Sequence, residues 1–520
     1  MEEIIPFSDR LDFVHYRIMS NDKPSLYRLC VWKTACLLKD SYWDEVYGVD
    51  GTRNNPFLGF PTNIIQDLLD SVLNLASKTS LKVTDLYYLL TSGRIEHFKL
   101  EEILLKSDDF ISILMSLSVA CQKFQSLKLA KVFFTDHYMN YNKTKGYMKR
   151  AALECILSMS PNLVSVESCI EFDLKAIRNC ENLKVLKLNF LPITPLFQFL
   201  EEDYENFWPN NSLMILEVVE DVRHFMPYME LAIVLKYCTV LKEVNVDICK
   251  SLQYLHGQEM YDGTLDTKYG LKKCYLGNAF EMDGYATREG VHLATLTCPE
   301  MQEVTALVCD NDVIYALSNF PDLKRLVLQW DSVHGGDFRL GVAPALNKIG
   351  LNLKSLYLCN FYDVDFSAIA ACCPLLEELS VEYLSEYCGW EESQKSFFEK
   401  LKYLNIELII DTPEAPQGCS EKTLILLLSS CRDLVTLYLK NAACLSDSVL
   451  TNILEKNSLL KVSDAKIIDS RLSDNGVRNL ITHLAALDFF CFSSSHISFE
   501  DAAEIVHVIN PQIILTSEEY

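Results

Sequence analysis

A short motif of the form Leu-x-x-Leu-x-Leu recurs through most of this chain. Its second half alternates between apolar and variable residues, as in a strand with one buried face. The copies lie roughly 20 to 33 residues apart, and the stretches between them have helical spacing. One strand and one helix repeating at this period predict a solenoid, whose units bury their apolar faces against one another. The clear copies are 183–188, 241–246, 323–328, 353–358, 376–381, 401–406 and 434–439, and the weaker ones are 126–129, 213–218, 271–276, 301–307 and 484–489.

Five of these repeats carry a cysteine three residues before their first apolar position. The resulting Cys-x-x-Leu-x-x-Leu-x-Leu pattern resembles the cysteine-containing leucine-rich repeats of many ubiquitin-ligase substrate receptors. We interpret these thiols as buried structural residues stacked along the solenoid. The expected fold is an α/β leucine-rich-repeat solenoid, a horseshoe of the cysteine-containing type, with a small all-α N-terminal cap. The five, called the repeat cysteines below, are Cys180, Cys238, Cys298, Cys373 and Cys431.

Composition and motifs exclude several classes of function. The net charge of −24 would repel a phosphate backbone, so we expect no nucleic-acid partner. None of the 19 cysteines forms a Cys-x-x-Cys pair, which argues against a zinc site or a redox motif. No apolar run is long enough to cross a bilayer, and the first residues show no signal-peptide pattern. No nucleophile-elbow, zinc-protease or phosphate-loop motif is present, so we expect a non-enzymatic cytoplasmic protein without cofactors, with a nuclear location also open.

The first hundred residues lack the repeat and predict two helices instead. The segment 24–38 opens with a proline at a favourable first-turn position. Leu26 and Cys30 within it lie four residues apart, on one face of the predicted helix. This segment resembles the elongin-binding half of a VHL-type box. The resemblance implies binding to elongin C, with elongin B in the same complex, through Ser25, Leu26, Cys30 and Thr34, although Thr34 stands where that family usually has an aliphatic residue.

The second predicted helix follows an irregular stretch that is rich in Gly, Asn and Asp. It is similar to the cullin-selecting half of the same box, which runs apolar, Pro, two variable, apolar, three variable, apolar. Phe60, Pro61, Ile64 and Leu68 match this pattern at every position. The form that selects cullin-5 has a second proline where this chain has Asn63, so the resemblance favours cullin-2.

Both halves of the box, ahead of leucine-rich repeats, look like the zyg-eleven and zer-type substrate receptors of cullin-2 RING ubiquitin ligases. Those relatives continue into an armadillo-like array that this chain lacks, so their recognition of N-terminal glycine is not carried over. The resemblance implies a non-catalytic, substrate-recognition subunit of a cullin-2–elongin BC ligase. The expected domains are an N-terminal extension at 1–23, the helical module at 24–92 and the solenoid at 93–520.

The substrate is expected on the concave strand side of the solenoid. Aromatic and acidic side chains between the strand leucines are candidates, because aromatics favour binding hot spots and carboxylates attract basic partners. We predict substrate contacts at Trp330, Tyr357, Glu378, Tyr383 and Tyr438.

Two other interpretations stay open. The segment from Phe60 could begin an F-box that binds Skp-one and cullin-1, although the Cys-x-x-Trp-like ending of such a box is missing. The N-terminal helices could instead be a plain cap on a leucine-rich-repeat scaffold without a link to a ligase. Exposure of Leu26 and Cys30 would indicate a partner, whereas burial would favour the cap.

Overall fold

The computed structural model forms two compact units, Met1–Val219 and Glu220–Tyr520, which are described separately. Among the described residues, no helix is long and apolar enough to cross a membrane. The residues that the structure describes are 26–39, 55–76, 81–135, 143–189, 207–218, 226–278, 284–331, 335–384, 398–408, 421–457 and 459–517.

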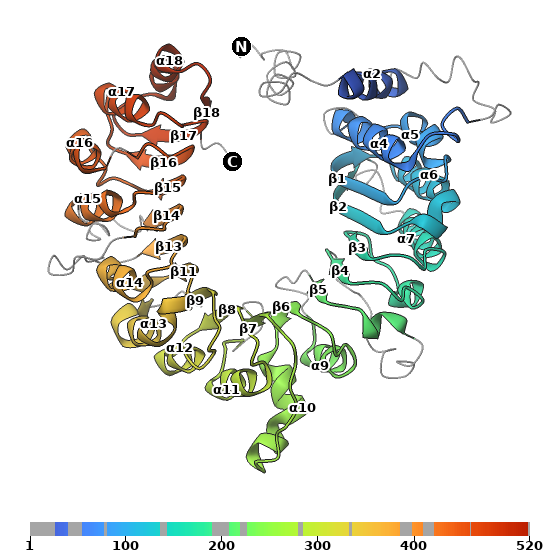
Figure 1. Cartoon of the computed structure of the whole chain (residues 1–520), viewed down its shortest axis with the longest axis horizontal. Helices are drawn as coiled ribbons and strands as arrows, with labels where there is room; N and C mark the ends of the chain where they lie inside the picture. The colour runs from blue at the N-terminus through green and yellow to red at the C-terminus, as the bar shows by residue number, and fades with distance from the viewer. Residues whose placement is uncertain are drawn as a thin grey trace. The chain divides into compact units, whose positions relative to one another are not determined.

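The first unit begins with three helices, α2 (Leu26–Lys39), α4 (Thr62–Ala76) and α5 (Val83–Leu90) (Figure 1). Helix α2 packs on α4, and α4 in turn contacts α5 and β1 (His97–Leu105). These helices therefore cover the start of the repeat array, where a solenoid exposes the apolar edge of its first unit.

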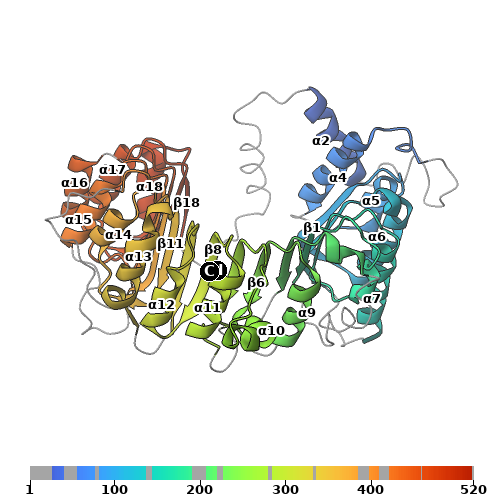
Figure 2. The same ribbon diagram turned by 60° about the horizontal axis from the view of Figure 1, so that its bottom comes forward.

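The repeats of the first unit place short parallel strands side by side, in the order β1-β2-β3-β4-β5. Strand β2 (Ser126–Phe134) is as long as β1. Each of these two strands bends at a residue with a left-handed backbone conformation, Glu102 in β1 and Lys131 in β2. Helical segments follow the strands and lie on one side of them (Figure 2). The remaining elements are β3 (Ser165–Ser168), β4 (Val185–Leu188), β5 (Ile215–Val218), α6 (Ser107–Leu117), η1 (Ser118–Lys123), α7 (Lys143–Ser158), η2 (Leu174–Ile177) and η4 (Trp208–Asn211).

The second unit continues the same strand-then-helix plan with parallel strands throughout its main sheet. Its strands are β6 (Glu243–Asp247), β7 (Lys273–Leu276), β8 (Glu303–Val308), β9 (Arg325–Trp330), β11 (Ser355–Cys359), β13 (Glu378–Leu384), β14 (Tyr403–Leu408), β15 (Thr436–Lys440), β16 (Asp464–Ser470), β17 (Phe489–Ser494) and β18 (Ile514–Thr516). Its helices are α9 (Tyr228–Tyr237), α10 (Cys249–Tyr261), α11 (Arg288–Thr297), α12 (Asn311–Leu317), η5 (Phe338–Val342), α13 (Ala343–Ile349), η6 (Gly350–Asn352), α14 (Phe366–Cys372), α15 (Glu421–Ser430), α16 (Asp447–Lys456), α17 (Asp474–His483) and α18 (Phe499–Ile509), and a small parallel pair joins β10 (Gly336–Asp337) to β12 (Phe361–Tyr362).

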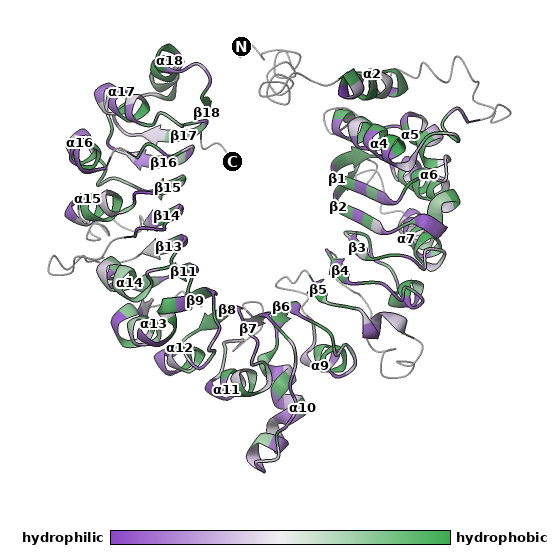
Figure 3. Ribbon diagram, in the orientation of Figure 1, coloured by the Kyte–Doolittle hydropathy of each residue, from purple (hydrophilic) through white to green (hydrophobic). Residues whose placement is uncertain are grey.

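Side chains alternate along the strands between the core and the open side, as the motif predicts. In β8 the buried positions Val304, Ala306 and Val308 alternate with half-buried ones. Figure 3 shows the same change between hydrophobic and hydrophilic residues along β1 and β2. We call the open side of each sheet, opposite the helices, the strand face. The α/β leucine-rich-repeat fold is thereby confirmed for the described part of the chain.

The repeat cysteines are buried and unpaired by disulfides, as expected from their spacing. Burial raises the pKa of Cys180, Cys238 and Cys431 to about 12. Two of these thiols donate to backbone carbonyl groups: Cys431 Sγ lies 3.2 Å from Leu427 O, and Cys180 Sγ lies 3.4 Å from Ser160 O. They are therefore protonated core residues that also satisfy local acceptors.

One element differs from the sequence-based expectation. The first strand of the array is β1, which begins at His97, before the earliest motif copy found in the sequence at 126–129. Its sequence, HFKLEEILL, has the alternation, but the left-handed Glu102 displaces its later leucines by one position. A pattern search with fixed spacing misses a strand that contains such a bend.

Candidate partner-binding surfaces

The buried side chains of helix α2 lie from Val31 onward. Val31, Ala35 and Leu38 are buried on the side that packs against α4. At the end of the helix, Lys39 forms a 2.7 Å ion pair with Asp85, a buried carboxylate that also accepts the Lys82 backbone N–H at the start of α5. The C-terminal half of α2 therefore has both apolar and ionic anchors.

The first half of α2 is exposed over five consecutive residues, Leu26–Cys30. Leu26 is 78% exposed and Leu29 is 40% exposed, although both are leucines on a helix that buries its other face. The Tyr27 hydroxyl donates to Asp67 of α4. This hydrogen bond is the main cause of the raised pKa of Tyr27, and burial is the second. The bond holds the exposed half of the helix against α4, so its apolar surface is presented in a fixed orientation.

The other predicted elongin-binding positions are placed as follows. Cys30 is exposed beside Leu26, as the predicted helix requires. Thr34 is partly exposed, and its Oγ1 donates to Cys30 O over 2.9 Å. This bond satisfies the hydroxyl of Thr34 within the helix. Ser25 lies outside the described residues.

The predicted cullin-selecting residues divide into two groups. Phe60 is 41% exposed, Pro61 just before α4 is also exposed, and Ile64 is partly exposed. The Phe60 ring contacts the buried Phe57 ring at 5.6 Å, which fixes its position. Leu68, by contrast, is buried in the module with 3% of its surface exposed. The first three positions form a small apolar surface, and Leu68 supports it from inside.

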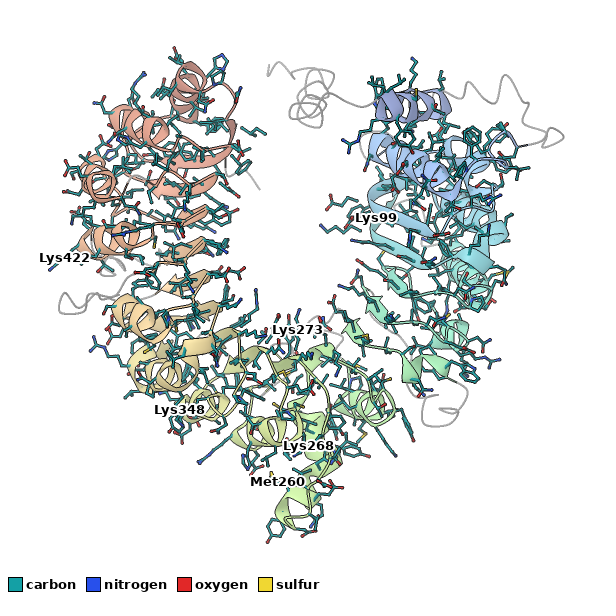
Figure 4. The ribbon with its side chains drawn as sticks, in the orientation of Figure 1. Lys99, Met260, Lys268, Lys273, Lys348 and Lys422 are labelled. Atoms are coloured by element: carbon teal, nitrogen blue, oxygen red, sulfur yellow. The ribbon has the colours of Figure 1, made fainter. Side chains whose placement is uncertain are left out.

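The strand face of the first unit carries paired charges. Lys128 of β2 lies 2.7 Å from Glu101 of β1 and 3.7 Å from Glu167 of β3. Lys187 of β4 lies 2.9 Å from Glu217 of β5. Hydrogen bonds from Lys128 and from Lys99, the strand-side lysine labelled in Figure 4, lower the pKa of Glu101 to about 2. This face is a ladder of alternating charges that neutralise one another.

The predicted substrate residues lie on strands of the second unit, but in different settings. Trp330 is the last residue of β9, and its ring centroid lies 5.8 Å from that of Phe361. The ring also packs over Gly336, where an added Cβ would lie 2.5 Å from Trp330 Cε3. Glu378 is exposed and pairs with Arg325 at 3.2 Å. The side chain of Tyr383 lies outside the described residues.

Tyr357 and Tyr438 are brought to the same strand face by the register of the sheet. Tyr357 pairs with Ser380, Ser380 with Asn405, and Asn405 with Tyr438, so these residues form one row across four strands. Both tyrosines are partly exposed and donate their hydroxyls to carboxylates, Tyr357 to Glu382 and Tyr438 to Asp464.

Two residues of this face, Tyr403 and Asp464, were not among the predicted positions. Each is the first residue of its strand, paired with Glu378 and Thr436 respectively. Tyr403 stands directly before the second apolar position of the copy at 401–406, in the same place as the predicted Glu378 in the copy at 376–381, so the signal was present in the sequence. Asp464 begins a strand that the motif copies did not include.

The described residues hold no metal-binding cluster. No group of three or more His, Cys, Asp or Glu side chains is arranged to hold a metal ion in that part of the chain. A shallow open depression is lined by Thr62, Asn63, Gln66, Glu96 and His97. Gln66 is already engaged by the His97 backbone, donating to His97 O at 2.8 Å and accepting from its N–H at 3.3 Å.

The fold and these surfaces define a leucine-rich-repeat protein with an apolar helix exposed on its N-terminal module. No protein-family model matches the chain, and no curated protein matches it. Among solved structures, the chain is similar to one titled "Crystal structure of Rad7 and Elc1 complex in yeast", with a TM-score of 0.39 and 11% identity over 99% of this chain and 98% of that one. A similarity this distant carries no argument about function.

Proposed function

We propose that this chain is a substrate receptor of a cullin-RING ubiquitin ligase and binds elongin C through helix α2. The observation that carries the proposal is the 78% exposure of Leu26, the first residue of a helix that buries Val31, Ala35 and Leu38 and ends in the ion pair of Lys39 with Asp85. A helix whose only role was to cap the first repeat would turn its leucines inward. The adjacent Leu29 and Cys30 extend the same exposed apolar surface.

The proposed contact is of the helix-in-groove kind. Leu26 is the anchor that enters an apolar pocket of elongin C, and Cys30, one turn further along, packs beside it. The methyl group of Thr34 completes the row, since its hydroxyl is bonded inside the helix. Burying a leucine side chain contributes about 1.5 to 3 kcal/mol, so Leu26 alone accounts for a large share of the affinity.

The cullin contact is proposed at the start of α4. Phe60, Pro61 and the partly exposed Ile64 form the surface, and the neighbouring Leu58 adds further apolar area, being 48% exposed. Leu68 holds this end of α4 in place from the core. The match of these positions to the cullin-selecting pattern favours cullin-2.

In this account the chain supplies proximity and not chemistry. The ubiquitin-conjugating enzyme on the RING subunit would transfer ubiquitin, and the repeats would hold the substrate close to it, in the cytoplasm. Positioning of this kind accelerates transfer by converting a bimolecular encounter into one within a complex.

The test is co-purification of the tagged full-length chain from cells, scored for elongin C, elongin B, cullin-2 and Skp-one. We expect the wild type to recover the elongins and cullin-2, and a Leu26→Ser, Cys30→Ser variant to lose them. Leu104→Ser is the matched control, because Leu104 is a comparably exposed leucine, 55% exposed, on β1. Recovery of Skp-one instead would assign the module to the F-box class, and recovery of neither adaptor would refute a ligase role.

A further inference from the structure

One part of the strand face in the second unit carries two carboxylates that have no cationic partner among the described residues. Glu382 of β13 accepts hydrogen bonds from the Tyr357 hydroxyl and from Asn405 Nδ2, the latter over 2.7 Å. Asp464 of β16 accepts from the Tyr438 hydroxyl over 2.9 Å. Neither carboxylate forms an ion pair with any residue that the structure describes. All these donors are neutral, so both negative charges remain.

The tyrosines on this face stay protonated. Burial is the main cause that raises the pKa of Tyr438 to about 12, and the hydrogen bond to Asp464 is the second. Burial also raises the pKa of Tyr403, and the negative charges of Glu382, Glu378 and Asp464 raise it further. Tyr403 therefore lies within the field of all three carboxylates.

The aromatic rings on this face are ordered. Tyr403 and Tyr438, on neighbouring strands, meet edge to face with ring centroids 5.7 Å apart. Ring and carboxylate together form a favourable site for a guanidinium or ammonium group, which is attracted both by π-electrons and by negative charge.

The charges around Glu382 limit where such a cation can bind. Arg325 is held by Glu378 at 3.2 Å, and Lys440 is held by Glu407 at 3.0 Å. Lys466 lies two residues beyond Asp464 on β16 and bounds the acidic area on that side. The centre of the area is thus at β13 and β14, around Glu382 and Tyr403. On the strand face of the first unit, the described glutamates Glu101, Glu167 and Glu217 each pair with a lysine.

We propose that the strand face formed by β11, β13, β14, β15 and β16 binds an extended, arginine- or lysine-bearing segment of a substrate protein. This proposal rests on the proposed function, because the bound segment is a substrate only if the chain is a ligase receptor. A basic side chain of the segment lies over Tyr403 and pairs with Glu382. The net charge of −24 favours approach of a basic partner from a distance, and the tyrosine–carboxylate pairs select the place where it binds.

The test uses a short fluorescein-labelled peptide of alternating arginine and serine, titrated with the purified full-length protein by fluorescence anisotropy. The variant Glu382→Gln keeps an oxygen that accepts from Tyr357 and Asn405 but removes the charge. The control Glu167→Gln removes the same charge from the paired ladder of the first unit. We expect Glu382→Gln to weaken the affinity for the peptide about tenfold and Glu167→Gln to change it by less than about twofold. Only the first variant loses a close charge pair with an arginine of the peptide.

A second variant, Tyr403→Leu, keeps an apolar side chain and removes the ring, and we expect it to weaken binding as well. Equal weakening by Glu382→Gln and Glu167→Gln, or no binding of the arginine peptide to the wild type, would overturn the proposal. The Leu26→Ser, Cys30→Ser variant should bind the peptide like the wild type, and Glu382→Gln should still recover elongin C. If the wild type bound the peptide but did not recover the elongins, only the ligase role would be refuted. If it recovered the elongins but did not bind the peptide, only this binding surface would be refuted.

Discussion

Asp247 connects two successive repeats of the second unit, and its substitution gives a prediction with a definite sign. Its Oδ1 accepts the backbone N–H of Cys249 at 2.9 Å and that of Gly277, in the next repeat, at 2.7 Å. Gly277 has a φ of +89°, and a side chain there would lie 2.8 Å from Ala286 N, so the backbone around the Gly277 N–H is closely packed. Asp247→Ala leaves two N–H groups without this acceptor, at about 1 kcal/mol each, so we expect a loss of about 2 kcal/mol in the free energy of unfolding.

Asp247→Asn separates the charge of this residue from its role as an acceptor. Part of Asp247 stays exposed, but its carboxyl group is densely surrounded by protein, and burial raises its pKa above the ordinary value of 3.8. A raised pKa in the folded state means that the native protein binds the proton more tightly than the unfolded chain does. The free energy of unfolding therefore falls as pH rises from 3.8 through the raised pKa, and the loss persists at neutral pH.

The asparagine side chain keeps an oxygen for both N–H groups and carries no charge. We expect Asp247→Asn to be at least as stable as the wild type at neutral pH and to lack this component of the pH dependence. Urea unfolding followed by circular dichroism, at neutral pH and near pH 4, measures both quantities. If Asp247→Asn were as unstable as Asp247→Ala, or had the pH slope of the wild type, the reasoning would be refuted.

Three further predictions concern packing and thiols. Leu38→Ala, in the buried face of α2, should lower the free energy of unfolding by about 2 to 5 kcal/mol, whereas Leu26→Ser should change it by less than about 0.5 kcal/mol; denaturant titrations of both variants check this. Gly476→Ala should cost about 1 to 3 kcal/mol in the same assay, because its new Cβ would lie 2.1 Å from Oδ1 of Asp447, which accepts the Ser473 N–H at the start of α17; a neutral result would contradict the packing described. Cys30 should react with a disulfide reagent in the native protein at neutral pH, while the repeat cysteines should react only after unfolding, as mass spectrometry of the labelled peptides can show.

The repeat architecture was predictable because it depends on spacing alone. A leucine at every second position of a strand, and a cysteine at a fixed distance before it, are visible in the sequence, and burial of the repeat cysteines follows from that spacing. The first strand was missed as a motif copy because Glu102 adopts a left-handed conformation that breaks the alternation. Glycine, asparagine and aspartate signal such left-handed bends in a sequence, whereas a glutamate such as Glu102 does not.

The candidate surfaces were predictable only in part. The spacing of Leu26 and Cys30 predicts a shared helix face, but whether that face is covered depends on how α2 packs on α4, which is a tertiary property. Leu68 illustrates the same limit, since its helical spacing from Ile64 does not reveal that it lies in the core. The pairing of Glu382 with Tyr357, 25 residues apart, depends on the register between strands joined by a connection of variable length.

The central claim is that the exposed half of α2 binds elongin C. Its most direct test is a calorimetric titration of the purified chain with the purified elongin B–elongin C heterodimer, using wild type, Leu26→Ser and the control Leu104→Ser. We expect saturable binding by the wild type and the control, and an affinity weakened by about tenfold or more in Leu26→Ser, with unchanged thermal stability. Absence of binding by the wild type, or equal affinity in Leu26→Ser, would contradict it.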